Sequence, residues 1–351
     1  MWASERSPVN PIPIGILGAT GMVGQRMVSL LAGHPWFQIA YVAASQRSAG
    51  RTYAEATRWL LPGEPPPEVA RMPVRACDPD QLPGGVRIVL SALDRAVAGP
   101  VEEIFRDLGC AVITNAGNHR MDPDVPLIIP EVNAHHLSLV DERSSKGFIV
   151  ANPNCCAIPL AMALAPLHRR WPVEAVLCAT WQAASGAGYP GEASWDLLDT
   201  VHPHAGDEED KLTQEPQKIL GFPGVPLSFP VSARCVRVPV SDGHLIGLSA
   251  RLRGNPDPDD VAEAMRTWEG WGPPLPSCPR PPLRVLAGRD RPNTRQDRDT
   301  GRGMVVSIGR VERCPILGVK LYALGHNTIR GAAGAAIANA ELIVATDRVP
   351  G

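Results

Sequence analysis

A short apolar segment that leads directly into a glycine-rich turn constrains the fold of this chain more than any other feature. Residues 12–17 are expected to form a buried strand, and the sequence Gly18-Ala19-Thr20-Gly21-Met22-Val23-Gly24 follows at once. The apolar side chains after the turn recur on one helix face that ends near Gly33. They are Val23, Met27, Leu30 and Leu31.

The order strand, glycine turn and helix is the context that a phosphate-binding turn needs. Without side chains at Gly18 and Gly21, the backbone can approach a pyrophosphate, and the helix N-terminus adds partial positive charge. We therefore predict a dinucleotide-binding turn. A plain tight turn is the alternative.

The residues that follow the second expected strand indicate which dinucleotide is bound. This strand covers residues 37–44, and in folds that bind NAD its end usually carries Asp or Glu for the ribose 2′-hydroxyl. Here the sequence is Ser45-Gln46-Arg47-Ser48-Ala49-Gly50-Arg51, which contains hydroxyl groups and arginines but no acid. This pattern suits a 2′-phosphate and predicts NADP as the cofactor. An ordinary solvated basic loop is the alternative.

Strands and helices alternate through the first part of the chain. Further strands are expected at residues 86–93 and 110–114, with a helix at residues 99–108 between them. This alternation predicts an α/β fold with a Rossmann-type doubly wound parallel sheet over roughly the first 150 residues. Arg120 falls in a loop after a strand, on the side where such sheets bind ligands. It is either an anion-binding arginine or a surface charge.

The pattern changes after residue 155. Strands are expected at residues 173–182, 236–240, 245–252, 303–311 and 316–324. One clear helix among them begins after Asp257, which supplies its cap. These elements predict a second, α+β catalytic and dimerisation domain with a mixed sheet.

The last segment predicts how the two domains share the chain. A helix rich in Gly and Ala is expected from Asn327, as its cap, to about Thr346, and it should return to the first domain. We therefore expect an NADP-binding domain of residues 1–150 plus 327–351. Residues 151–326 would form the catalytic and oligomerisation domain.

Cys155 occupies a position at which a thiol can become a nucleophile. It is followed by small and apolar residues that predict a buried helix from residue 156 to about 165, with Pro159 tolerated in the first turn. Unpaired N–H groups and the helix dipole at this terminus favour a thiolate, which could attack a carbonyl. A buried core cysteine is the alternative.

Several polar residues of the second domain are candidates for the same chemistry. Gln182 ends a strand before a glycine-rich loop, and Glu208 and Lys211 would share a helix face within a charged turn. Arg237 is expected inside an apolar strand, where it would need an anion, so it is a candidate carboxylate clamp. His244 is a candidate general acid/base, because imidazole ordinarily titrates near neutral pH. The alternatives are a structural Arg–Glu pair and a turn histidine.

Composition argues against several functional classes. The formal net charge of -2 gives no electrostatic case for binding nucleic acid or an anionic membrane. No window approaches the roughly 18 apolar residues of a membrane span, and the first residues lack the apolar region of a signal peptide. The cysteines are scattered without a C-x-x-C pair or a zinc-like Cys/His spacing, so no metal is predicted. We predict a cytoplasmic protein.

Several stretches from about residue 12 to the C-terminus resemble aspartate-β-semialdehyde dehydrogenase, specifically its archaeal and fungal branch. In chain order they are Gly18-Ala19-Thr20-Gly21-x-Val23-Gly24, Ala44-Ser45-x-Arg47-Ser48-Ala49-Gly50, Asn118-His119-Arg120-Met121-Asp122-Pro123-Asp124-Val125-Pro126-Leu127, Asn152-Pro153-Asn154-Cys155, Ser185-Gly186-Ala187-Gly188-Tyr189-Pro190-Gly191, Asp242-Gly243-His244 and His326-Asn327-Thr328-x-Arg330-Gly331-Ala332-Ala333-Gly334. Together they form a specific pattern in the order of the family.

The resemblance implies a reductase that acts on an acyl phosphate. β-Aspartyl phosphate and NADPH would give aspartate semialdehyde, phosphate and NADP⁺. Cys155, preceded by Asn154, would displace phosphate to form a thioacyl enzyme. His244 would activate the thiol and protonate the thiohemiacetal oxygen, and Gln182 would orient the acyl group.

The resemblance also implies binding roles. Arg237 would hold the α-carboxylate of the substrate and Glu208 its ammonium group, whereas Arg120, Lys211 and Asn118 would bind phosphate. The residues implied in NADP binding are Gly18, Thr20, Gly21, Met22, Val23, Ser45, Arg47, Ser48, Ser91, Ser185, Gly186 and Asn327. The family further suggests a homodimer or homotetramer.

This chain departs from the family pattern in places, and two alternatives follow. Cys156 stands where the family usually carries Ser or Thr, and the family's usual Pro-containing segment is missing after Ser91. One alternative is a reductase of another acyl phosphate or acyl thioester, such as a malonyl-CoA reductase type, in secondary metabolism. The thioester type should lack the Asn before the cysteine and the acidic turn, both of which are present. The other is a silent nucleotide-sensing protein on the same fold, which the joint presence of the candidate catalytic residues disfavours.

Overall fold

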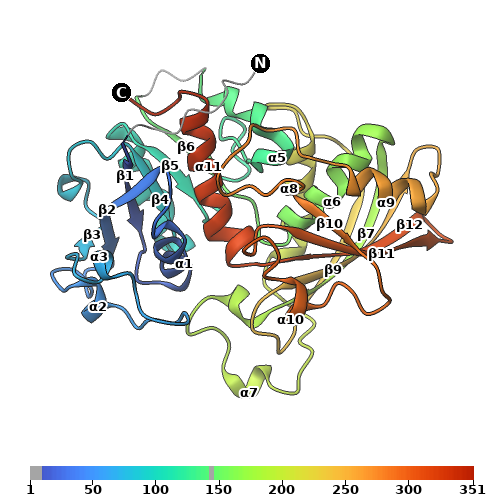
Figure 1. Ribbon diagram of the computed structural model, residues 1–351, viewed down its shortest axis with the longest axis horizontal. Helices are drawn as coiled ribbons and strands as arrows, with labels where there is room; N and C mark the ends of the chain where they lie inside the picture. The colour runs from blue at the N-terminus through green and yellow to red at the C-terminus, as the bar shows by residue number, and fades with distance from the viewer. Residues whose placement is uncertain (1–9, 142–145) are drawn as a thin grey trace.

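The computed structural model describes residues 10–141 and 146–351, which contain two six-stranded sheets (Figure 1). The first six residues, which were considered for a signal peptide, lie outside the described residues. Among the residues described, no helix combines the length and the apolar character that crossing a membrane requires.

The first sheet is parallel throughout, with the strand order β3-β2-β1-β4-β5-β6. Its strands are β1 Ile12–Leu17, β2 Phe37–Ala44, β3 Arg75–Ala76, β4 Ile88–Ser91, β5 Ala111–Thr114 and β6 Phe148–Ala151. The order reverses at β1 and β4, so the carboxyl ends of these two strands mark the crevice in which such sheets bind ligands. The predicted Rossmann-type sheet is confirmed.

The second sheet is mixed, with the strand order β10-β11-β12-β9-β7-β8. Its strands are β7 Val173–Gln182, β8 Val231–Arg237, β9 His244–Leu252, β10 Leu283–Leu286, β11 Val306–Cys314 and β12 Gly318–Gly325. The pairs β7–β8 and β10–β11 are parallel, and the other neighbours are antiparallel. This arrangement confirms the predicted mixed sheet.

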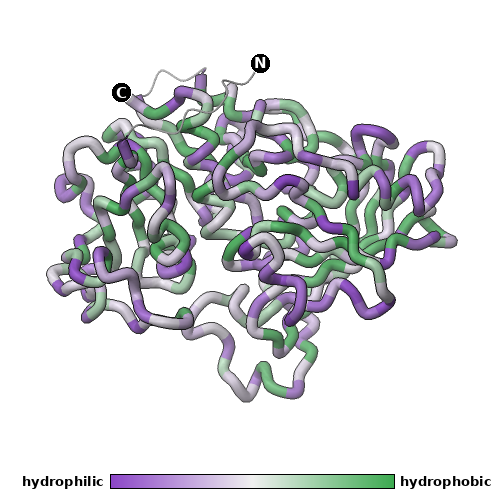
Figure 2. Tube along the Cα trace, in the orientation of Figure 1, coloured by the Kyte–Doolittle hydropathy of each residue, from purple (hydrophilic) through white to green (hydrophobic). Residues whose placement is uncertain are grey.

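The α-helices vary from single turns to fourteen residues. They are α1 Met22–Leu31, α2 Tyr53–Ala56, α3 Pro67–Ala70, α4 Arg95–Asp107, α5 Pro130–Asn133, α6 Ala157–Arg170, α7 Ser194–Leu197, α8 Glu208–Leu220, α9 Pro258–Arg266, α10 Thr294–Asp297 and α11 Gly334–Ala345. Asp257 accepts a hydrogen bond from the Asp259 N–H and caps α9, as predicted. Figure 2 shows hydrophobic stretches along the sheets and hydrophilic stretches in peripheral loops.

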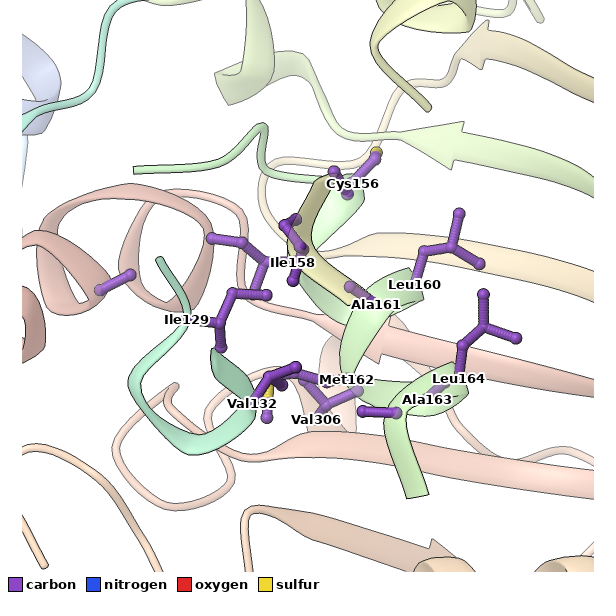
Figure 3. Close-up of a cluster of buried hydrophobic side chains, with 14 of the residues drawn as sticks. Ile129, Val132, Cys156, Ile158, Leu160, Ala161, Met162, Ala163, Leu164 and Val306 are labelled. Atoms are coloured by element: carbon purple, nitrogen blue, oxygen red, sulfur yellow. The ribbon is translucent and has the colours of Figure 1, made fainter. Parts of the chain in front are cut away.

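The helix α6 forms the centre of the larger hydrophobic core (Figure 3). Every residue from Ala157 to Leu167 is buried, and the helix contacts β9, β11 and β12 of the second sheet. A helix that is apolar on all sides is stable only when it is enclosed. Pro159 lies in its first turn, where the missing N–H costs no intrahelical hydrogen bond. The burial of α6 fixes the position of its N-terminus, where Cys155 lies.

Two expectations in the second half of the chain were wrong. The strand expected at residues 236–240 is β8 at Val231–Arg237, because Pro239 cannot donate to a sheet ladder. The charged turn around Glu208 is the first turn of the thirteen-residue helix α8. Three acidic residues there favour helix formation through the dipole, and apolar side chains further along are buried.

Asn327 does not cap the final helix, contrary to expectation. Its side chain accepts a hydrogen bond from the Gly243 N–H and donates one to the Ser185 hydroxyl, both at 2.8 Å. A π-helical turn, Ile329–Ala333, precedes α11. As expected, α11 packs against α1, β4 and β5 of the first sheet (Figure 1).

Candidate active site

Cys155 lies in the turn between β6 and α6, and its environment favours the thiolate. The Asn154 side-chain oxygen accepts hydrogen bonds from the backbone N–H groups of Cys156 at 2.9 Å and Ala157 at 3.2 Å, which fixes this turn. A hydrogen bond from the Cys156 thiol, followed by the nearby His244 and Arg120, holds the pKa of Cys155 well below its ordinary value although burial opposes this shift. Cys155 as a residue keeps partial solvent access, unlike Cys156.

Cys156 has the opposite character. It is fully buried, and burial together with the adjacent Cys155 raises the pKa of the Cys156 thiol well above its ordinary value. The two neighbouring cysteines therefore form one thiolate and one neutral thiol, and only the thiolate is a nucleophile.

His244 begins β9 and is completely buried. Its Nδ1 accepts a hydrogen bond from the Ala183 N–H at 3.0 Å, so the neutral imidazole carries its proton on Nε2. A Cβ atom at Gly186 would lie 3.0 Å from the His244 Cε1 and 2.6 Å from the Arg237 Nη1, so the backbone approaches this site closely only because residue 186 is glycine.

Cys155, Cys156 and His244 are the one group of three potential metal ligands that the structure brings together within the described residues, with ligand atoms at most 4.8 Å apart. A metal would need the lone pair of the His244 Nε2. Because the Ala183 N–H occupies Nδ1, the proton sits on Nε2, which is buried without a hydrogen-bond partner among the described residues and lies within 4.8 Å of the Cys155 sulfur. The donor set therefore suits thiolate stabilisation better than metal coordination.

Gln182 is held between residues of opposite charge. Its Nε2 donates to the Glu208 carboxylate and its Oε1 accepts from the Arg237 Nη1, each at 3.3 Å. Arg237 is the last residue of β8, not an interior one as predicted, and it is almost fully buried. Its Nε donates to Glu192 at 3.2 Å, so it makes the Arg–Glu pair that was the alternative to a carboxylate clamp, with a partner that the sequence did not identify.

Glu208 connects the nucleophile segment with Lys211. Both of its carboxylate oxygens accept from the Asn154 amide, at 3.0 and 2.9 Å, and Oε1 also accepts from the Lys211 Nζ at 2.8 Å. The predicted i, i+3 pair on one helix face is thus present. Lys211 also contacts Asp207 at 2.6 Å. These carboxylates and their hydrogen bonds outweigh burial and raise the pKa of Lys211, so this group stays cationic.

Arg120 lies close to the same turn, but Asn118 lies apart from it. The Arg120 Nη1 donates to Glu215 at 3.0 Å, and its Nη2 donates to the Asn115 carbonyl at 2.7 Å. Asn118 is exposed and donates to the Arg95 carbonyl at 3.2 Å. No hydrogen bond among the described residues connects Asn118 with Arg120 or Lys211.

The turn between β1 and α1 has the geometry of a phosphate-binding loop. Gly18 has φ +73°, and a Cβ atom there would lie 2.5 Å from the Ala92 carbonyl oxygen. A Cβ atom at Gly24 would lie 2.2 Å from the Gly18 carbonyl oxygen, so α1 packs on the turn without space for a side chain. Glycines with these contacts permit a close approach of the backbone to a pyrophosphate. The residues Thr20, Gly21, Met22 and Val23 complete this turn and the start of α1.

The other predicted cofactor residues are divided between two places. Ser45, Arg47 and Ser48 are exposed or half-buried in a turn after β2, in which the Ser48 N–H donates to the Ser45 carbonyl at 2.9 Å. Ser185 lines a cavity of about 420 Å³ together with Met22 of α1. This cavity lies between the N-terminus of α1 and the loop at residues 184–191, where a dinucleotide would extend from the first sheet to Cys155.

Ser91 does not face this cavity. It ends β4 with no exposed surface, and its hydroxyl donates to the buried Glu102 carboxylate at 2.6 Å. Thr114 donates to the same carboxylate oxygen, also at 2.6 Å. Burial raises the pKa of Glu102 against these two hydrogen bonds. Ser91 therefore supports the end of the sheet from within.

Two functional side chains were missed at the sequence level. Glu215 is buried beside the nucleophile, and Glu192 pairs with Arg237. Glu215 follows Glu208 by seven residues and thus lies on the same face of α8, a periodicity that would have revealed it had the charged turn been read as a helix. Glu192 lies in a loop, and no local pattern marks it.

Comparisons with known proteins agree with this geometry. The model of the semialdehyde dehydrogenase NAD-binding domain matches residues 13–140, and that of the semialdehyde dehydrogenase dimerisation domain matches residues 164–330. An aspartate-semialdehyde dehydrogenase from Methanothermobacter thermautotrophicus is 44% identical, with 95% of this chain and 99% of the relative covered. One from Schizosaccharomyces pombe is 41% identical, with 94% of this chain and 97% of the relative covered.

Solved structures give the same result. The crystal structure of aspartate semialdehyde dehydrogenase with NADP from Candida albicans has a TM-score of 0.88 at 38% identity and covers 97% of this chain and 100% of that chain. Aspartate semialdehyde dehydrogenase II from Vibrio cholerae has a TM-score of 0.76 at 27% identity, with coverages of 95% and 99%. The resemblance to archaeal and fungal members is confirmed, and the chain belongs to the semialdehyde dehydrogenase family.

Proposed function

We propose that the protein is an NADPH-dependent aspartate-semialdehyde dehydrogenase. It would convert L-aspartyl 4-phosphate to L-aspartate 4-semialdehyde through a thioacyl intermediate on Cys155, in the biosynthesis of the aspartate family of amino acids. The observation that carries the proposal is the thiolate at Cys155, which has Arg120 nearby, while Glu208 and Gln182 link Lys211 and Arg237 to the same site. A substrate with two anionic ends and an electrophilic carbonyl fits this arrangement. The relatives reported above favour it over an acyl-coenzyme A reductase.

The first half of the reaction needs a nucleophile and a place for the leaving phosphate. The Cys155 sulfur attacks the acyl carbon, and the C–O bond to phosphate breaks as the thioester forms. Arg120 and Lys211 stabilise the charge on the departing phosphate. Gln182 has its amide fixed by Glu208 and Arg237, so it can orient the acyl group without rearranging.

The second half of the reaction needs a group that donates a proton to the thiohemiacetal oxygen. NADPH, when bound, supplies the hydride that reduces the thioester. The Nε2–H of His244, which has no hydrogen-bond partner among the described residues, would protonate the thiohemiacetal oxygen, and return of this proton to Nε2 would let the oxyanion expel the Cys155 thiolate and release the aldehyde. His244 would end the cycle with its proton on Nε2, as it began, in agreement with the hydrogen bond that its Nδ1 accepts.

The residues that the resemblance implies would bind the substrate and the cofactor. The Nη2 group of Arg237 makes no hydrogen bond among the described residues and would hold the α-carboxylate, while Glu208 would hold the ammonium group. NADP would lie over Gly18, Thr20, Gly21, Met22 and Val23. Its 2′-phosphate would contact Ser45, Arg47 and Ser48, and its nicotinamide end would approach Ser185, Gly186 and Asn327.

We further propose how the molecule is divided and assembled. Residues 1–150 plus 327–351 would form the cofactor domain, supported by the packing of α11 on the first sheet, and residues 151–326 the catalytic domain. The matched dimerisation domain supports an oligomer, which we propose is a homodimer or homotetramer. All eight cysteines are free thiols, which suits a reducing compartment such as the cytoplasm.

The reverse reaction tests the function directly. NADPH formation would be followed by absorbance with NADP⁺, phosphate and L-aspartate semialdehyde, with succinate semialdehyde and malonate semialdehyde plus coenzyme A in parallel. We expect phosphate-dependent turnover with aspartate semialdehyde alone. Turnover only with another aldehyde would refute the substrate assignment and leave the thiolate chemistry in place.

A further inference from the structure

Glu215 has no role in the reaction described above, yet it touches two parts of the site. It lies on α8 and is 2% exposed. Its Oε2 accepts a hydrogen bond from the Asn154 backbone N–H at 2.6 Å, and its Oε1 accepts one from the Arg120 Nη1 at 3.0 Å. One buried carboxylate therefore joins the peptide before the nucleophile to the arginine proposed for phosphate.

The same helix also holds the backbone of the Arg120 loop. The Lys218 Nζ, three residues after Glu215, donates to the carbonyl oxygens of Arg120, Asp122 and Val125 at 2.8, 2.7 and 2.8 Å. All three N–H donors of this ammonium are thus used on one loop. Helix α8 therefore holds this loop in two ways. Lys218 binds the loop backbone, and Glu215 binds the side chain of Arg120.

The hydrogen bonds of Arg120 leave some donors free in a defined direction. Its Nη1 and Nη2 are bound to Glu215 and the Asn115 carbonyl, whereas its Nε is buried without an acceptor among the described residues. An arginine has five N–H donors in a rigid planar fork, so two fixed bonds determine where the others point. The Nε–H thus lacks an acceptor among the described residues.

We infer that Glu215 is a positioning residue, which orients the Arg120 guanidinium toward the phosphate group in register with Cys155. This inference rests on the proposed function. Phosphate displacement requires the sulfur, the acyl carbon and the phosphate to be aligned, and small errors in such an arrangement are costly in rate. A carboxylate tied to both the Cys155 segment and Arg120 sets this alignment before the substrate binds.

The variant Glu215→Gln separates the two contacts. Glutamine is neutral and has one acceptor oxygen in place of two, so in either amide orientation the ion pair with Arg120 is lost, whereas the Asn154 N–H needs only a neutral acceptor. In the direction of aldehyde oxidation, the first NADPH forms with the thioester before phosphate is needed, whereas later turnovers need phosphate to cleave the thioester. We expect the burst of NADPH to keep its rate within about 3-fold. We expect kcat/KM for phosphate to fall at least 10-fold, about 1.4 kcal/mol.

Controls keep the result specific. Asp210→Asn removes a carboxylate from the exposed side of the same helix and should change neither phase. If Glu215 acts through Arg120, then Glu215→Gln should add little to the loss already caused by Arg120→Ala. Should Glu215→Gln not fold, Glu215→Asp, one methylene shorter, should show the same loss in the phosphate phase.

Three results would overturn the inference: an unchanged phosphate phase, an equal loss in both phases, or additive losses with Arg120→Ala. Absence of any burst or turnover in the wild-type protein with aspartate semialdehyde would instead overturn the proposed function itself.

Discussion

The two adjacent cysteines at the start of α6 differ in protonation because Cys155 accepts a hydrogen bond that the Cys156 thiol donates. Cys156 lies inside the core with its pKa raised by burial, while Cys155 faces the site with its pKa lowered by that neighbour, by His244 and by Arg120. An activated nucleophile usually depends on a base, whereas here fixed donors stabilise the thiolate in advance. The departure at Cys156 therefore preserves the hydrogen-bond donor that a Ser or Thr would supply.

The pH dependence of alkylation tests this relation. A thiol whose pKa is lowered stays ionised to lower pH, so iodoacetamide should inactivate the wild type well below the ordinary cysteine range of about 8.5. Cys156→Ala removes the donor and should move the inactivation profile to higher pH, whereas Cys156→Ser keeps a donor and should stay near the wild type. Identical profiles for all three proteins would contradict the argument.

Turnover provides the matching measurement. Cys155→Ser should lower kcat by at least about 1,000-fold, a barrier increase of about 4 kcal/mol. Cys156→Ser should retain most of the activity. Equal losses in the two variants would show that the nucleophile was wrongly assigned.

At the scale of secondary-structure elements, the π-helical turn Ile329–Ala333 places backbone directly against the nucleophile. A Cβ atom at Gly331 would lie 2.6 Å from the Cβ of Cys155 and 2.9 Å from its Cα. These are the backbone and the first side-chain atom of a fixed turn, and they cannot rotate away. The shape of this turn therefore determines where the sulfur lies.

Gly331→Ala should accordingly lower both activity and stability. We expect kcat to fall at least 10-fold as Cys155 is displaced, and a loss of about 1–3 kcal/mol in the free energy of unfolding from overpacking. Steady-state kinetics and urea unfolding measure the two effects. Gly84→Ala serves as the control because a Cβ there meets nothing within 4 Å. Unchanged kinetics in Gly331→Ala would show that the π-helical turn can shift without displacing Cys155.

The turn after β2 provides a second test at this scale. Arg47 is exposed, so its removal should not disturb the fold. If it contacts the 2′-phosphate, Arg47→Ala should raise KM for NADPH about 10-fold, or about 1.4 kcal/mol, and leave KM for NADH nearly unchanged. Initial rates measured over a range of NADPH concentrations, and separately over a range of NADH concentrations, give this difference. An equal rise for both cofactors would refute the 2′-phosphate contact.

At this scale, the sequence could predict features that depend on residues close together in the chain, but not those that depend on contacts between distant segments. The segment from β1 through Gly24 to α1 was predictable because strand, turn and helix are local patterns, and β2 and β7 were placed correctly for the same reason. Glu192 and Glu215 could not be predicted as partners of arginines, because those contacts join elements far apart in the chain. Asn327 was assigned as a cap on local grounds, but tertiary hydrogen bonds to Gly243 and Ser185 prevailed.

At the scale of the whole molecule, one buried ion pair secures the segment that approaches Cys155. Arg330 is completely buried and makes two hydrogen bonds of 2.7 Å to Glu131 of α5. Burial alone would raise the pKa of Glu131, but Arg330 more than compensates and lowers it. The pair contributes stability above the ordinary Glu pKa, and this contribution is lost as the pH falls through the lowered value.

The second sheet has one face that is partly exposed among the described residues. Its inner face packs against α6 and α9, while its outer face has a hollow of about 420 Å³ lined by Leu177, Gly247, Arg310 and Tyr322. Leu177 projects from β7 and is 47% exposed. A large apolar side chain in the centre of an open sheet face is typical of an interface between subunits.

Leu177→Glu should therefore dissociate the oligomer without unfolding the chain. The carboxylate would be removed from water in the assembled state but solvated in the monomer, which shifts the equilibrium toward the monomer. Light scattering on the eluting protein should show a smaller mass for this variant than for the wild type at equal concentration. Val97→Glu, a similar change at an exposed position of α4, should keep the wild-type mass. An unchanged mass in Leu177→Glu would place the interface elsewhere on the molecule.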